Sequence, residues 1–394
     1  MPNLSIPAAA PASIAALQQG ATQGVLVDTD FRNLFASGAV KTASPLAEGQ
    51  IQPASLDLRL GTKAYRVQAG FLPGKNRKVT ECLEGLTMTE LDLTQPQLFE
   101  RGAVYLVPLQ ESVNLPSFIE GTASPKSSTG RLDIFVRLVT DNASIYDTVA
   151  PGYSGGLYVE ISPLTFPIVI RAGDRLNQLR LRQGDVRVSD ADLTELHKQV
   201  PLLRQQAECA ESVMSQGLWI SIDLHGQQKN SVGDNPVIGY RAKHHTQPID
   251  LARIGGYQWS HFWEPITRSN SKPLILYPEE FYIFASSEGI CVPPTHAAEL
   301  VAYDTRVGEI RVHYAGFFDP GFGYVGAGSP ENGTTAVLEV RAHDVPCVLE
   351  HGQPIGRFIY EKLLEAPSTV YGSGIGSNYA GQGLKLAKQF KMEA

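Results

Sequence analysis

The sequence is poor in cysteine, has no long apolar run and carries no excess of basic residues. Its 394 residues include four cysteines, at Cys82, Cys209, Cys291 and Cys347, without paired spacing. They provide neither a disulfide framework nor a CxxC metal site, so we expect a reducing, cytoplasmic location. No stretch approaches about 18 uninterrupted apolar residues, so we expect no membrane span. The net charge of −7 argues against binding to a nucleic-acid polymer, because such proteins usually present a basic surface.

Short apolar runs between turn-forming residues dominate what is present. The sequence contains 37 glycines and 26 prolines, and the segments between them are rich in Val, Ile, Leu, Tyr and Phe. This pattern is typical of a mainly β sandwich or barrel. The predicted strands are Val104–Val107, Ile134–Val139, Leu157–Ile161, Ile168–Ile170, Tyr282–Ala285, Glu309–Tyr314, Ala336–Val340 and Arg357–Tyr360. Helices are predicted over Asp28–Ser37, with a stop at Gly38, and over Asp190–Ser215, where apolar residues recur at helical spacing.

The order of motifs in the first half recurs in the second half. Offsets of 175 to 179 residues separate equivalent positions, which indicates an internal duplication. The equivalent elements are Val104–Val107 and Phe281–Phe284, Arg131 and Arg306, Glu160 and Glu339, and Gly173 and Gly352.

We therefore divide the chain into two tandem β-domains with additional segments. Residues 1–25 are predicted to be a flexible arm, 26–188 the first β-domain and 189–215 a helical connector. Residues 216–365 form the predicted second β-domain, and the Gly-rich residues 366–394 form a predicted lid or tail.

A small, polar and basic segment precedes a predicted strand in the first half. Backbone N–H groups, hydroxyls and a guanidinium are donors that suit phosphate oxygens. An ordinary solvated turn is the alternative interpretation. The segment consists of Lys126, Ser127, Ser128, Thr129, Gly130 and Arg131, and it is named the phosphate motif below.

The second half contains a turn, Asp319-Pro320-Gly321, that joins two predicted strands. Backbone groups at Ala315 and Gly316 are candidates for contacting a pyrimidine edge, because small residues permit close approach. The alternative is a purely structural hairpin.

Two glutamates, Glu160 and Glu339, lie within apolar strands. On a solvent-facing side of a sheet they would be ordinary exposed carboxylates. Enclosed, a carboxylate would have a raised pKa and could transfer protons. The sequence leaves both possibilities open. The His244-His245 pair lacks metal-ligand spacing, and we predict no protein-bound metal.

These motifs resemble those of the deoxycytidine triphosphate (dCTP) deaminase branch of the dUTPase-like superfamily. The resemblance spans about residues 26–390 and matches the long, duplicated bacterial form. It rests on four segments: Ile51–Gly61, which includes Pro53, Ala54, Ser55, Asp57 and Arg59; Pro125–Arg131; Ala315–Phe322; and the tail positions Tyr371, Asn378 and Gln382. The family commonly has Lys where this sequence has Asn378.

The resemblance implies tandem jelly-roll domains, trimeric association of domains, and sites at domain interfaces. An assembly of three chains is expected and would give six β-domains; a different closed symmetry is the alternative. The resemblance also implies hydrolytic deamination of dCTP to dUTP and ammonia without a metal at the reacting carbon. In agreement, the sequence lacks the H-x-E and P-C-x-x-C arrangement of zinc nucleobase deaminases. Mg²⁺ is expected to arrive with the substrate triphosphate.

The two halves depart from the family pattern in complementary ways. The first half keeps the phosphate motif but has Ala150 where the hairpin Asp is expected. The second half keeps Asp319 and Glu339, but its phosphate motif is replaced by Ala302–Arg306. We therefore predict a composite site in which the phosphate motif faces Asp319 and Glu339. Glu339 is the first candidate for the catalytic base and Glu160 the second.

Other functions remain open at this point. A dUTPase or a bifunctional deaminase and dUTPase would use similar motifs, although Ala315, Gly316 and Glu339 favour deamination. A catalytically dead nucleotide-binding regulator is the alternative of another class.

Overall fold

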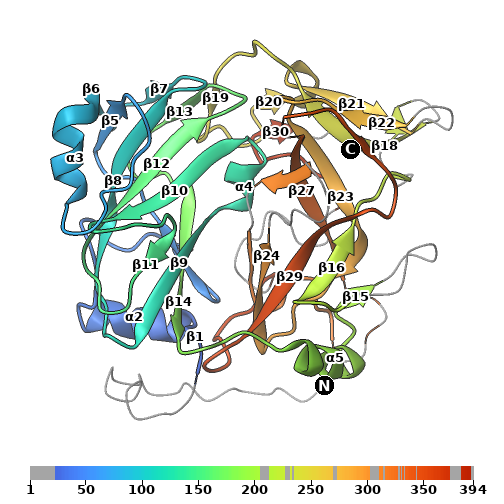
Figure 1. Cartoon of the computed structure of the whole chain (residues 1–394), viewed down its shortest axis with the longest axis horizontal. Coiled ribbons are helices and arrows are strands. Elements are labelled where there is room, and N and C mark those ends of the chain that lie inside the picture. The colour runs from blue at the N-terminus through green and yellow to red at the C-terminus, as the bar shows by residue number, and fades with distance from the viewer. Residues whose placement is uncertain are drawn as a thin grey trace.

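The chain folds mainly into β-strands, which confirms the predicted fold class (Figure 1). Among the described residues, no helix has both the length and the apolar character needed to cross a membrane. The computed structural model describes residues 23–204, 213–226, 231–232, 235–268, 273–301, 310–313, 316–326, 329, 331, 333–342, 344–372 and 383–391.

The first half contains two six-stranded sheets with its core between them. One sheet has the order β11-β9-β14-β4-β3, with β1 beside β14, and the other has the order β10-β12-β8-β5-β6, with β2 beside β8. The strands of the one are β1 (Gly24–Val25), β3 (Ile51–Gln52), β4 (Ser55–Leu58), β9 (Ile119–Pro125), β11 (Thr148–Val149) and β14 (Asn177–Gln183). Those of the other are β2 (Val40–Thr42), β5 (Lys63–Val67), β6 (Thr87–Asp92), β8 (Val104–Asn114), β10 (Ile134–Thr140) and β12 (Ser154–Pro163).

The second half repeats this two-sheet plan. A seven-stranded sheet has the order β17-β18-β23-β27-β25, with β15 and β21 attached, and a four-stranded sheet has the order β16-β29-β24-β26. The strands of the first are β15 (Leu203–Arg204), β17 (Ser231–Val232), β18 (Asn235–Ala242), β21 (Trp263–Thr267), β23 (Tyr282–Ile290), β25 (Ile310–His313) and β27 (Thr334–Ala342). Those of the second are β16 (Leu218–Ser221), β24 (His296–Val301), β26 (Phe317–Phe318) and β29 (Pro354–Lys362).

Smaller sheets complete the fold. The three-stranded sheet β19-β13-β7 joins the two halves, because β19 of the second half pairs with β13 of the first. The remaining strands are β7 (Gln97–Phe99), β13 (Ile168–Ile170), β19 (Ile249–Asp250), β20 (Tyr257–Gln258) with β30 (Phe390–Lys391), and β22 (Leu274–Leu276) with β28 (Cys347–Leu349).

The strand registers reproduce the sequence repeat. Glu160 on β12 lies opposite Leu106 on β8, and Glu339 on β27 lies opposite Ile283 on β23. A tyrosine next to each of these apolar partners accepts an equivalent hydrogen bond. The Tyr105 hydroxyl accepts the N–H of Glu100 at 3.0 Å, and the Tyr282 hydroxyl accepts the N–H of Tyr277 at 3.1 Å. The duplication is therefore visible at the level of single hydrogen bonds.

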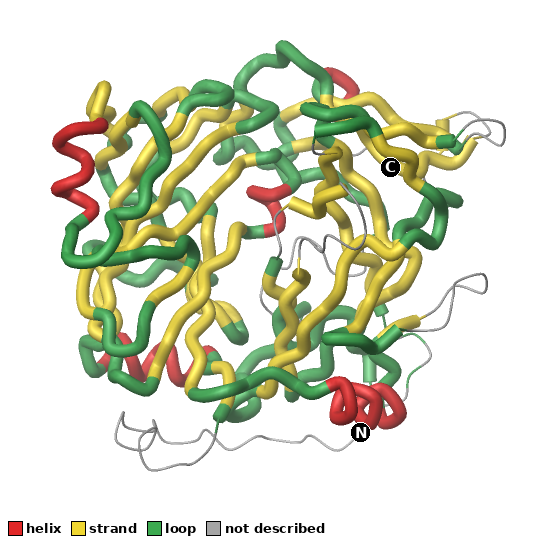
Figure 2. Tube along the Cα trace, in the orientation of Figure 1, coloured by secondary structure: helices red, strands yellow, loops and turns green. Residues whose placement is uncertain are grey.

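The helices are short, and the turn over Ser127–Gly130 lies toward the middle of the molecule, between the two halves (Figure 2). The N-terminal helix begins as predicted and ends one residue before the predicted end, because Gly38 adopts a positive φ of 75° that stops it. The described helices are α2 (Asp28–Ala36), α3 (Val79–Leu86), α4 (Ser127–Gly130), α5 (Asp190–Gln199) and the 3₁₀ turn η1 (Trp259–His261).

The predicted helix over Asp190–Ser215 is wrong at residues 200–204 and 213–215, and residues 205–212 lie outside the described part of the chain. Val200 is extended, with φ −134° and ψ 112°, and β15 begins at Leu203. Pro201 accounts for the end of the helix, since proline disfavours helical geometry at the preceding residue and cannot donate an N–H.

Both ends of the described chain pack against the rest of the protein. The predicted flexible arm ends in β1, where Val25 is fully buried. Residues 383–391 of the predicted lid pack into the core through Leu386 and Phe390. Residues 1–22 and 373–382 lie outside the described residues.

The two halves lie side by side and share buried polar contacts (Figure 1). Arg180 on β14 is fully buried and donates to Glu361 on β29 at 3.1 Å. Arg182, two residues further along the strand, donates to the other oxygen of Glu361 at 2.7 Å. This arginine–glutamate–arginine group fixes the relative position of the halves at the edge where the site lies.

Candidate active site

A cavity of about 580 Å³ lies at the junction of the two halves. The phosphate motif of the first half forms one wall, and the hairpin and β27 of the second half form another. The structure therefore brings together the two groups of residues that the sequence predicts to be complementary. From the first half, Asp57, Lys126, Ser127, Ser128, Thr129, Arg131, Arg175 and Gln178 line the cavity; from the second, Gly316, Phe317, Asp319, Glu339, Tyr371, Lys388 and Gln389 do so.

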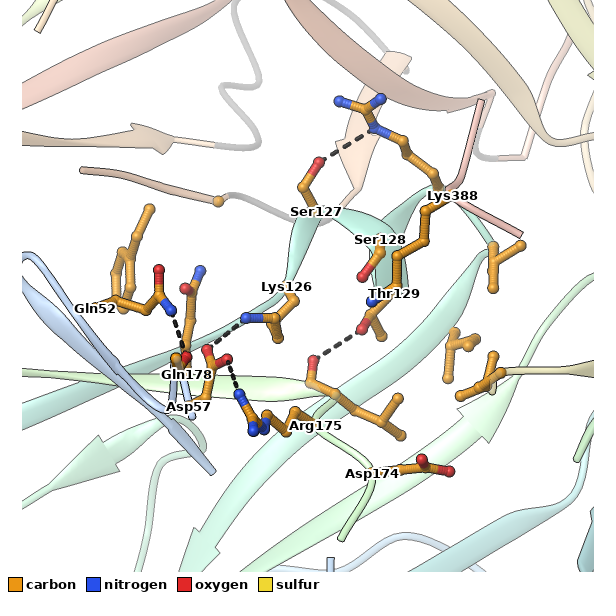
Figure 3. Close-up of a pocket in the computed structure, with 18 of the residues that line it drawn as sticks. Gln52, Asp57, Lys126, Ser127, Ser128, Thr129, Asp174, Arg175, Gln178 and Lys388 are labelled. Atoms are coloured by element: carbon orange, nitrogen blue, oxygen red, sulfur yellow. Dashed lines mark hydrogen bonds and ion pairs between the residues drawn. The ribbon is translucent and has the colours of Figure 1, made fainter. Parts of the chain in front are cut away.

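The phosphate motif forms the single turn α4, which follows β9 directly (Figure 3). Lys126, Ser127 and Ser128 line the cavity and are at least partly exposed. Thr129 is buried, and its hydroxyl donates to the Leu176 carbonyl at 2.9 Å. Gly130 is buried without lining the cavity. The motif thus divides into residues that face the cavity and residues that hold the turn.

Arg131 connects the motif to the second half. Its side chain is 2% exposed, its Nε donates to the Ser127 hydroxyl at 3.1 Å, and its Nη1 donates to the Lys385 carbonyl at 2.8 Å. The same Nε lies 4.0 Å from Oε1 of Glu339. The guanidinium is therefore placed to orient both a cavity hydroxyl and the candidate base.

Glu339 is a buried carboxyl in an enclosed part of this cavity. Burial raises its pKa to about 8; the charge of Arg131 partly opposes this effect, and the charge of Asp133 adds to it. A carboxyl with such a pKa exchanges protons near neutral pH.

Asp319 follows β26 and faces the same cavity. Burial raises its pKa to about 6, against the attraction of Arg180 and Lys126. Its Oδ1 lies 3.6 Å from Nη2 of Arg180, and this buried oxygen has no hydrogen-bond donor among the described residues. Arg180 also lies over the Phe317 ring at 4.1 Å, so one arginine positions the hairpin and its acid.

Glu160 lies elsewhere, away from the phosphate motif. It accepts hydrogen bonds from the Phe71 N–H at 3.1 Å and the Tyr146 hydroxyl at 3.2 Å, and burial raises its pKa. A Cβ at Gly70 would approach Glu160 Oε2 to 2.5 Å, so the chain packs closely over the carboxylate. Glu160 does not line the junction cavity, in contrast to Glu339.

Of the predicted tail residues, Tyr371 lies at the cavity. Its N–H donates to the Pro320 carbonyl at 2.7 Å, and its ring lies 5.4 Å from that of Phe322. The predicted residues Ala315, Asn378 and Gln382 lie outside the described residues, as does Ala302–Arg306.

Several charged residues at the cavity were not predicted as site residues. Asp57 accepts a hydrogen bond from Lys126 and lies 3.6 Å from Nη1 of Arg175 (Figure 3). Asp57 belongs to the quoted Ile51–Gly61 segment, so the sequence contained a signal for it. Lys388 lies after the Gly-rich tail, where no motif marks it. In the part of the chain that the structure describes, no group of three or more His, Cys, Asp or Glu is arranged to hold a metal ion.

Family comparisons agree with this two-part arrangement. The 2'-deoxycytidine 5'-triphosphate deaminase N-terminal domain matches residues 22–185, and the C-terminal domain of the same family matches residues 189–390. The chain belongs to the dCTP deaminase family.

The crystal structure of 2'-deoxycytidine 5'-triphosphate deaminase from Agrobacterium tumefaciens is similar across both halves. It is 48% identical, covers 87% of this chain and 99% of its own, and superposes with a TM-score of 0.80. With this similarity, the tandem dUTPase-like jelly-roll architecture predicted from the sequence is confirmed.

Shorter relatives match about 40% of the chain. A protein named "dCTP deaminase, dUMP-forming" from Parafrankia sp. is 34% identical over 161 residues, which are 40% of this chain and 75% of its own length. One named "dCTP deaminase" from Halorubrum lacusprofundi is 31% identical over 159 residues, which are 39% of this chain and 75% of its own length. This chain is therefore a member of a family of enzymes that act on dCTP.

Proposed function

We propose that the enzyme hydrolyses dCTP to dUTP and ammonia in the junction cavity, with Glu339 as the general base. One observation carries the proposal: a buried carboxyl of the second half, with a pKa of about 8, shares a cavity with the phosphate motif of the first half. A titratable group strongly perturbed by desolvation in a cleft is a candidate functional group.

In the proposed reaction, ionised Glu339 takes a proton from water, and the resulting hydroxide adds to C4 of cytosine. The C4–N4 bond then breaks, and the proton held by Glu339 passes to the departing amine. One water is consumed and ammonia leaves. The proton of the C4 hydroxyl moves to N3, and the C4 oxygen becomes the uracil carbonyl. Arg131 keeps the carboxylate in place from 4.0 Å and stabilises its ionised form.

The remaining cavity residues are assigned to substrate binding. Lys126, Ser127 and Ser128 offer a cation and two hydroxyls to the phosphates. Asp319 offers an unoccupied acceptor oxygen to a donor of the substrate, such as a sugar hydroxyl or the cytosine amine. Gly316 and Phe317 flank the base end of the cavity.

We propose that Mg²⁺ enters bound to the triphosphate and is not held by the protein alone. Asp57, a buried acid beside the phosphate motif, is already engaged by Lys126 and Arg175. The wall thus offers cations to phosphate oxygens, and the hard oxygen ligands of Mg²⁺ would be the phosphates and water. We further propose association of three chains in the cytoplasm, which would group six β-domains; the described cysteines Cys82 and Cys291 are free thiols, as expected in a reducing location.

The decisive assay incubates dCTP with the wild-type enzyme and with Glu339→Gln and Glu160→Gln, and quantifies ammonia, dUTP, dUMP and pyrophosphate. We expect ammonia and dUTP from the wild-type enzyme, their loss by at least about 100-fold in E339Q, and near-wild-type turnover in E160Q. An active E339Q beside an inactive E160Q reverses the assignment. Formation of pyrophosphate and dUMP from dCTP would identify a bifunctional enzyme. Turnover of added dUTP but not of dCTP would identify a dUTPase, and binding of dCTP without turnover would identify a regulator.

A further inference from the structure

Residues 383–391, the last described part of the predicted tail, are fixed at the junction of the two halves. Leu386 and Ala387 are buried, and β30 pairs in parallel with β20. The Gly255 N–H donates to the Lys388 carbonyl at 2.9 Å. The backbone that carries Lys388 is therefore held by the protein core and by a strand.

This segment also contacts the phosphate motif directly. Arg131 donates to the carbonyl of Lys385, three residues before Lys388, at 2.8 Å. The Lys388 side chain lines the same cavity as Ser128 and Thr129 (Figure 3). A cation from the end of the chain thus reaches the wall that the first half provides.

The charges around the cavity separate into two groups. Those that act on Glu339 are Arg131 and Asp133. Those that act on Lys388 are Lys126, Asp57, Arg175 and Asp174. The charge of Lys126, a residue of the phosphate motif, thus acts on Lys388.

Lys388 and Lys126 are both partly buried and line the same cavity. Burial lowers the pKa of Lys388, and the charge of Lys126 lowers it further, whereas Asp57 opposes the shift. An anion with several oxygens would balance the positive charges of the two lysines and accept their hydrogen bonds, since each ammonium provides three donors.

We infer that Lys388 is a triphosphate-binding residue of the junction cavity, supplied by the anchored C-terminal segment and not by either phosphate motif. The inference rests on the proposed function for its ligand, and it adds a specificity: Lys388 favours a nucleoside triphosphate over a monophosphate. We assign it to phosphates beyond the first, because Lys388 lines the same cavity as Lys126 and Ser128 of the phosphate motif.

The test compares dissociation constants for dCTP, dCMP and inorganic tripolyphosphate, measured by calorimetry on full-length protein. The variants are Lys388→Met, which keeps the length of the side chain without its charge, and Lys388→Arg, which keeps the charge. Lys391→Met is the matched control, because Lys391 is exposed in the same segment. Each lysine substitution is made in the E339Q protein, and E339Q alone is the reference, so that no substrate is consumed.

We expect K388M to raise the dissociation constants for dCTP and tripolyphosphate by roughly 10- to 100-fold, as for a lost hydrogen bond to a charged group. The dissociation constant for dCMP should change by no more than about twofold. K388R should retain most of the affinity, and K391M all of it. Equal weakening of dCTP and dCMP, or K388M behaviour indistinguishable from K391M, overturns the inference. Thermal melting identifies a variant that fails by unfolding; Lys388→Gln then replaces K388M.

Failure of the inference about Lys388 can be distinguished from failure of the proposed deamination. If the enzyme with Glu339 intact releases no ammonia from dCTP, the proposed reaction fails, while the tripolyphosphate comparison still decides the role of Lys388. If deamination occurs and K388M binds normally, only the inference about Lys388 fails.

Discussion

At the scale of single residues, Glu339 and Glu160 show how the surroundings decide between two equivalent positions. Both lie opposite the same type of apolar partner in a duplicated strand pair. Glu339 faces a cavity with Arg131, whereas Glu160 is covered by Phe71 and Tyr146. The difference lies in the residues packed around each carboxylate.

The pH dependence of kcat/KM should report the ionisation of Glu339. A general base must be deprotonated, and its pKa is about 8. We expect kcat/KM for dCTP to rise about tenfold per pH unit below pH 8 and to level off above it, because this constant reports the free enzyme. Steady-state assays between pH 5.5 and 9.5 measure the profile. An apparent pKa near 4.5 in this profile would contradict the assignment of Glu339. E160Q is the control, and its profile should keep the apparent pKa near 8.

The same carboxyl should destabilise the folded protein near neutral pH. Its folded pKa of about 8 exceeds the ordinary value of 4.5, so the stabilisation present below pH 4.5 is lost as the pH rises toward 8. Glu339→Gln removes this loss. We expect the free energy of unfolding of E339Q to exceed that of the wild type by as much as about 3 kcal/mol at pH 7 and to equal it at pH 4. Urea unfolding at the two pH values tests this; an equal difference at both would show that Gln acts through packing instead.

At the scale of secondary structure elements, β14 connects the halves through two arginines that share Glu361. Arg180 and Arg182 are nearly fully buried, and Glu361 is 3% exposed. Removing the charge of one partner in such a group leaves the others uncompensated. The strand therefore contributes to the hairpin geometry as well as to the sheet, because Arg180 also contacts Phe317.

Glu361→Gln should therefore destabilise the protein by roughly 3 kcal/mol, in the range for breaking a buried ion pair. Glu299→Gln is the matched control: Glu299 also pairs with Arg182, at 3.2 Å, but its side chain is 29% exposed, and we expect a loss below about 1 kcal/mol. Urea midpoints for the two variants decide. Equal effects would show that burial of the ion pair is not what stabilises the junction.

At the scale of the whole molecule, duplication has produced two unlike halves that together form one cavity. The phosphate motif comes from the first, and Asp319 and Glu339 come from the second. Within the described residues, Glu160 lies outside this cavity.

We therefore expect one dCTP to bind per chain. Calorimetric titration of E339Q with dCTP should give a stoichiometry near one. A value near two would mean that Glu160 and the second half also form a site between chains, and E160Q would then lower it.

Local patterns in the sequence were sufficient for the predicted strands, though not for others such as β9 and β14, and for the start of α2 and the internal repeat, since alternation and turn residues act over a few positions. They also pointed to the pairing of the phosphate motif with Asp319 and Glu339, because the losses in the two halves complement each other. The length of α5 was overestimated where Pro201 stops it, although apolar spacing continues beyond.

Only the tertiary structure decided which glutamate meets the phosphate motif, because a strand residue reveals its periodicity and not what packs over it. The same holds for Arg180, whose role depends on a contact between residues 138 positions apart, and for Lys388, which returns to the cavity after a stretch without motifs. The sequence by itself determined the duplicated β-architecture and the set of chemical groups. Their positions relative to one another follow from packing between distant segments, which local patterns do not encode.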